Sequence, residues 1–158
     1  MPGVPSSSGS VQRLLETCAR VELVTAAIYR QLADLHGAHT EMRRLWLKTA
    51  DEEDNHAAQF RLAAAAYSSS IVDVAVTLDQ TTEALTYLAE LSSWITATAP
   101  SVKHALQRTI EMEERLASFH LDHVVSFASP VHRKLFAAMM AADRHHVLAL
   151  QQALEALS

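Results

Sequence analysis

The sequence contains one pattern of carboxylate and imidazole side chains twice, and the spacing within each copy constrains the fold more than any other feature. In each copy a Glu is followed about 30 residues later by an acid-x-x-His motif. The six residues are Glu22, Glu53 and His56 in the first copy, and Glu113, Asp143 and His146 in the second. A single acid-x-x-His motif carries little information, because about one is expected by chance in a chain with 18 acidic residues and 9 histidines. The repeated spacing is therefore the informative part.

The distance between the two acids of each copy fits a helical hairpin. Glu22 lies about 15 residues before the turn indicated by Gly37, and Glu53 lies about 15 residues after it. Because every residue of an α-helix adds the same rise, two antiparallel helices bring these acids to the same height. The acid and the His of each motif are three residues apart, so they share one helix face. Two such hairpins would place all six side chains in one layer.

An internal duplication supports the pairing of two hairpins. At an offset of 91 residues Glu22 aligns with Glu113, and at an offset of 90 the two acid-x-x-His motifs align, as do Trp46 and Phe136. The composition favours helices, with 49% hydrophobic residues but only 3 Gly and 4 Pro. The predicted fold class is therefore all-α, a four-helix bundle made of two antiparallel helical hairpins joined by a long crossover.

Apolar periodicity and capping residues locate the helices. We expect Ser10 and Thr40 to cap the first two helices, which would end near residues 36 and 67. The segment 68–80 contains a valine alternation typical of a strand, but a lone strand would have no partner, so an ordered connection is expected. The remaining predicted helices are an accessory helix at 81–99, a third bundle helix at 101–127, and a fourth that starts at Pro130.

The sequence predicts a single domain over residues 10–158, preceded by a flexible arm at 1–9. The net charge is −5 without runs of like charge, so neither a nucleic-acid surface nor a membrane-binding patch is indicated. The first residues do not resemble a signal peptide, and Cys18 is the single cysteine. We expect a cytoplasmic protein in which Cys18 is a small buried side chain.

The apolar faces around Glu22 and Glu113 predict that these acids lie inside the bundle. A buried carboxylate without compensation costs several kcal/mol, and four around one point would be intolerable. Two divalent cations would balance the negative charge of four ionised carboxylates. Bound metal would therefore explain why these acids lie inside the bundle. Carboxylate and imidazole ligands with open positions suit iron or manganese better than structural zinc. The neighbouring acids, by contrast, are assigned to exposed helix faces: Glu52, Asp54, Glu111 and Glu114.

With these motifs the chain resembles the ferritin-like di-iron carboxylate superfamily, and within it the rubrerythrin di-iron domain without a rubredoxin domain. The resemblance covers residues 11–157 and implies two iron ions, with manganese or a mixed pair as the alternative metals. We expect Tyr29 and His120 to orient the carboxylates from beside the metals, with simple core packing as the alternative. His120 itself departs from the family pattern, which has an aromatic residue seven positions after the Glu that corresponds to Glu113. The chain departs from the rubrerythrin pattern at Leu116, where that family has an extra carboxylate, and at Asp143, where a Glu is usual.

The resemblance implies a redox protein that reduces peroxide or dioxygen and receives electrons from an external donor. Three alternatives remain: a ferroxidase that handles iron, a hydroxylase with an organic substrate, and a metal-free helical scaffold. A homo-oligomer is compatible with each of them, and among assemblies a dimer is favoured. Neither a nucleic acid nor a membrane is expected as a partner.

Overall fold

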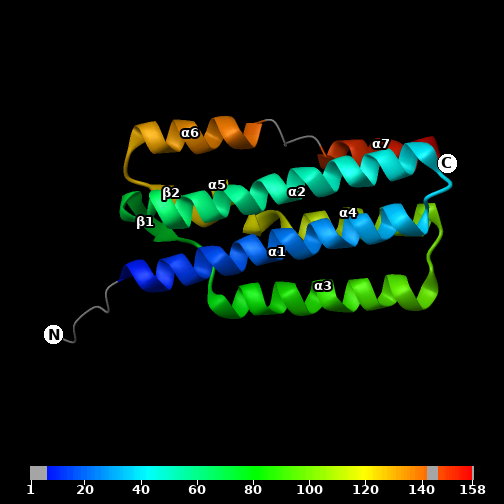
Figure 1. The fold of residues 1–158 in the computed structure, drawn as a ribbon, viewed down its shortest axis with the longest axis horizontal. Coiled ribbons are helices and arrows are strands. Elements are labelled where there is room, and N and C mark those ends of the chain that lie inside the picture. The colour runs from blue at the N-terminus through cyan, green and yellow to red at the C-terminus, as the bar shows by residue number, and fades with distance from the viewer. Residues whose placement is uncertain (1–6, 142–145, 158) are drawn as a thin grey trace.

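The first two long helices form an antiparallel hairpin in the computed structural model, which describes residues 7–141 and 146–157. Helix α1 spans Ser7–Leu35 and helix α2 spans Thr40–Ala66, and they pack along their whole length (Figure 1). The predicted caps are wrong by a few residues. Ser10 lies within α1, and α2 is capped by His39, whose Nδ1 accepts a hydrogen bond from the backbone of Met42 at 3.3 Å.

The crossover carries the expected accessory helix. Helix α3 spans Leu78–Thr98 and begins with a capping box in which Thr77 and Gln80 exchange hydrogen bonds. It packs against α1, where the Gln31 side chain hydrogen-bonds to Ser92 and Thr96. Helix α3 therefore covers the side of α1 that faces away from α2.

The second half departs from the predicted pattern. Helix α4 begins after its cap Ser101 but ends at Leu116, so the expectation of one helix over 101–127 is wrong. After α4 come short segments. They are the 3₁₀ helix η2 (Ala117–Phe119), helix α5 (Leu121–Val124) and strand β2 (Val125–Phe127).

A small sheet explains the interruption of α4. Strand β1 (Ile71–Val74), which follows the 3₁₀ helix η1 (Ser68–Ser70), pairs antiparallel with β2. The backbone bonds from Ala75 to Val124 and from Ala128 to Ser70, both 2.7 Å, continue the pairing at its two ends. The strand-like alternation in the crossover thus has a partner, and β2 is extended because its backbone groups bind β1 rather than their own helix.

Two further helices complete the bundle. Helix α6 spans Pro130–Ala141 and helix α7 spans His146–Ala156; α7 packs against α4 and α2 (Figure 1). Residues 142–145 lie outside the described residues, as do residues 1–6 of the expected arm, whereas residues 7–9 belong to α1. The all-α bundle is confirmed. Within the described residues no helix is both long and apolar enough to cross a bilayer.

Candidate metal centre

Three carboxylates lie in the interior of the bundle, each from a different helix. Glu22 of α1, Glu53 of α2 and Glu113 of α4 are 4%, 1% and 3% exposed. On each helix the neighbouring turns are apolar, which places the acid on the packed face. Burying ionised carboxylates is strongly unfavourable unless cations or hydrogen-bond donors compensate for the lost hydration. The local surroundings must therefore supply positive charge.

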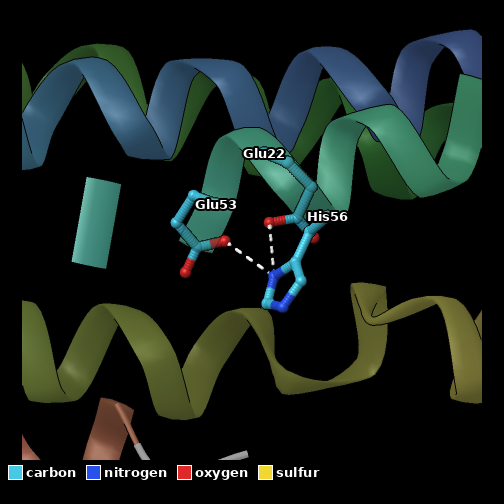
Figure 2. A group of neighbouring side chains, drawn as sticks. All are labelled: Glu22, Glu53 and His56. Carbon is cyan, nitrogen blue, oxygen red and sulfur yellow. Dashed lines mark hydrogen bonds and ion pairs between the residues drawn. The ribbon is translucent and has the colours of Figure 1, made fainter. Parts of the chain in front are cut away.

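The first group of potential ligands joins α1 to α2 (Figure 2). His56 Nδ1 lies 3.1 Å from Glu53 Oε2 and 3.8 Å from Glu22 Oε2. Glu53 and His56 are three residues apart on α2, and Glu22 reaches them from α1 because the hairpin brings the acids to one height, as the spacing predicted. Their ligand atoms lie within 4.8 Å of one another, a separation that one metal ion can span.

The second group joins α2 to α4 and α7, and it also contains Glu53. His146 Nε2 lies 3.0 Å from Glu113 Oε2 and 3.3 Å from Glu53 Oε1. Glu53 thus turns one carboxylate oxygen toward His56 and the other toward His146. A carboxylate placed in this way can bind two metal ions at once.

The donor atoms fit a pair of iron or manganese ions. Glu53 Oε1 is buried and accepts no hydrogen bond from the described residues, so a cation would satisfy it. The two groups together offer three carboxylates and two imidazoles but no thiolate, a set that suits iron and manganese rather than structural zinc. The sixth predicted ligand, Asp143, lies outside the described residues.

Protons on the two imidazoles can supply positive charge beside the buried carboxylates. Burial alone would lower the pKa of His56, but its contacts with Glu22 and Glu53 outweigh burial and raise that pKa to about 11. Burial would also lower the pKa of His146, but the contact with Glu113 outweighs burial and raises that pKa to about 9. Burial and the nearby charge of Glu22 raise the pKa of Glu53 to about 7. The two imidazoles are therefore imidazolium ions at neutral pH.

Tyr29 and His120 both lie beside the two groups of potential ligands. The fully buried Tyr29 hydroxyl donates a short hydrogen bond to Glu113 Oε1. Burial and the charge of Glu113 raise its pKa well above the usual value, so it keeps its proton and remains a donor. The His120 ring lies 5.5 Å from the His56 ring and 6.5 Å from the His146 ring, measured between ring centres.

Glu52 is a site residue that the sequence reasoning missed. It was expected on an exposed face, yet its side chain is only 14% exposed and its Oε2 lies 3.5 Å from His146 Nδ1. A carboxylate at the second ring nitrogen of a ligand histidine fixes the orientation of the ring. No local signal distinguishes Glu52 from other acids of α2, because its burial depends on where α7 packs.

A pocket of about 250 Å³ opens between α2 and α7 and reaches this pair. Its wall includes Glu52 and His146 together with the polar side chains of Lys48, Thr49 and Gln152. Cys18, by contrast, is completely buried, and burial raises its pKa to about 12. Cys18 is thus a neutral packing residue at ordinary pH.

Comparison with known proteins identifies a family for this chain. The model of the family described as rubrerythrin matches residues 13–154. No curated protein and no solved structure matched the chain.

The assignment of ligands can be tested by removing one acid-x-x-His motif. We expect Glu53→Ala together with His56→Ala to lower bound metal from about two ions per chain to one or none, because the shared carboxylate is lost from both groups. Replacing a buried ion pair by apolar side chains is often neutral, so the metal-free bundle should stay helical by circular dichroism. The control is Glu111→Ala with Glu114→Ala, two exposed acids beside Glu113. Full metal content in the first variant by elemental analysis would refute the assignment.

The stability of the metal-free protein should fall as the pH rises from about 6.5 to about 11. The pKa values of His56 and His146 are raised above 6.5, so their contribution is fully present below the unfolded value and is lost as the pH passes their folded values of about 11 and about 9. The raised pKa of Glu53 acts in the same direction between 4.5 and about 7. Urea unfolding of chelator-treated protein measures this slope.

The metal-loaded protein should show the opposite trend, because binding requires deprotonated ligands and releases protons. A metal-free protein whose stability rises over the same pH range would contradict the described charge arrangement.

Proposed function

The chain belongs to the rubrerythrin family, and we propose that it is a di-iron redox protein that reduces peroxide or dioxygen. One observation carries the proposal: Glu53 is a member of both buried groups of potential ligands and turns one oxygen toward each imidazole. A structural site for a single ion does not need a carboxylate that is shared between two groups of ligands. Two ions that change their oxidation state together do need one, because a carboxylate that binds both ions would keep them close.

When bound, two ferrous ions supply two electrons, which with two protons reduce one hydrogen peroxide to two water molecules. The side chains of the protein hold and orient the site. Glu22 and His56 would hold one ion, Glu113 and His146 would hold the other, and Glu53, which belongs to both groups, would contribute to each. The Tyr29 hydroxyl fixes Glu113, and Glu52 fixes the ring of His146 through its Nδ1.

The dimensions of the pocket between α2 and α7 favour a small substrate. Its volume of about 250 Å³ accommodates peroxide or dioxygen with water, and its wall combines the polar side chains of Lys48, Thr49 and Glu52 with apolar ones such as Leu45 and Leu148. A more apolar pocket of about 300 Å³ lies between β2 and α6, but none of its lining residues belongs to either ligand group. A hydroxylase reaction on an organic molecule is therefore the less favoured function.

Ferroxidase activity is the second candidate, and Glu52 is the observation that favours it. Its carboxylate lines the pocket that leads to His146, where it would attract ferrous ions from solution. The two functions differ in their response to iron. A ferroxidase turns over repeatedly when ferrous iron is supplied in excess, whereas a peroxide or dioxygen reductase needs an external electron donor after each oxidation.

Stopped-flow oxidation of the anaerobic diferrous protein tests the proposed reaction. Leu116, the last residue of α4, is buried and stands three residues after Glu113, so this position supplies no extra carboxylate. We therefore expect rate constants for dioxygen and peroxide within about tenfold of each other. A protein inert to dioxygen but rapid with peroxide would contradict this reasoning and favour a dedicated peroxidase.

The variant Leu116→Glu adds an acid on the face of Glu113. We expect it to raise the preference for peroxide by about tenfold or more, at a cost in stability from the buried charge. Leu116→Gln is the matched control, since Gln has nearly the same shape as Glu but carries no charge. An equal shift in both variants would show that the charge is not responsible.

A further inference from the structure

His120 lies where the expected long helix is interrupted. It stands between η2 and α5 as the residue that caps α5, and its backbone is held on both sides. Its N–H donates to Ala117 O at 3.4 Å, and its carbonyl accepts from the N–H groups of His123 and Val124, both at 3.0 Å. Strand β2, which pairs with β1, begins at Val125, directly after α5.

The three imidazoles form a nearly regular triangle. The His120 ring centre lies 5.5 Å from His56 and 6.5 Å from His146, and the latter two are 6.0 Å apart. Imidazoles bound to one ion through nitrogens about 2.1 Å away have ring centres roughly 5–6 Å apart. The separation between His120 and His56 falls in this range.

Core packing alone does not account for this imidazole. A neutral imidazole carries one nitrogen with a free lone pair, which is the form in which histidine binds a metal ion. Within the described part of the chain, neither ring nitrogen of the partly buried His120 takes part in a hydrogen bond or an ion pair, so neither is committed to a protein partner. A neutral imidazole in this position has the chemistry of a metal ligand.

We propose that His120 is a third imidazole ligand of the metal centre and binds the ion held by Glu22, Glu53 and His56. The proposal rests on the proposed function, because it requires that this ion is bound. An imidazole adds a ligand without adding negative charge, so the balance between carboxylates and divalent ions is unchanged. A further carboxylate in its place would add to the buried charge.

Cobalt(II) is a suitable probe, since its visible absorption reports the number of ligands and it does not react with dioxygen as iron does. We would titrate the natural protein, His120→Ala and His120→Phe with Co²⁺ and follow absorption and binding heat. His120→Phe keeps a ring for packing but has no ligand atom. His104→Ala, an exposed imidazole on α4, is the control.

We expect the natural protein and the control to bind two ions with the same spectrum. In both His120 variants one of the two ions should bind at least about tenfold more weakly, with a changed visible spectrum. Added 4-methylimidazole should restore the spectrum of His120→Ala but not that of His120→Phe, because only the smaller side chain leaves room for it.

Two negative results have different meanings. If the natural protein binds two ions and the His120 variants match it in affinity and spectrum, His120 is not a ligand and the proposed function still stands. If the natural protein binds fewer than two ions, both proposals fail. Weaker binding in His120→Ala without recovery on adding 4-methylimidazole would also overturn the assignment, since it would indicate a packing defect.

Discussion

The burial of Glu53 at the meeting point of α1, α2, α4 and α7 is the constraint on which the rest of the structure depends. Its two oxygens lie 3.1 Å from His56 Nδ1 and 3.3 Å from His146 Nε2, so neither half of the carboxylate is without a nearby nitrogen. Glu22 belongs to one of its two groups of potential ligands and Glu113 to the other. Without positive charge this arrangement would oppose folding, and every helix that contributes to it would be destabilised.

Protons and metal ions compete for the same nitrogen and oxygen atoms. In the metal-free protein the raised pKa values of His56 and His146 provide two positive charges inside the bundle. A metal pair would displace these protons and supply more charge at the same points. The fold therefore tolerates the acids in both states, and the hydrogen bond from Tyr29 to Glu113 and the contact of Glu52 with His146 are available in both.

Local spacing predicted much of the fold and of the site. The register of the hairpins anticipated that Glu22 would meet Glu53 and His56, and the duplication anticipated that Glu113 and His146 would join them. The length of α4 was not predictable, because β2 is extended only through pairing with β1, more than 50 residues earlier in the chain. Glu52 was missed for a similar reason: α7, a distant element, covers it. The role of these side chains as ligands stays a prediction, as does that of Asp143.

The most direct measurement is anomalous diffraction at the iron absorption edge from crystals of anaerobically iron-loaded protein. If Glu53 joins two ions, the map should contain two peaks about 3–4 Å apart on either side of its carboxylate, one beside His56 and the other beside His146. A single peak, or iron bound only at surface acids while Glu53 contacts no metal, would contradict this account of the buried carboxylates.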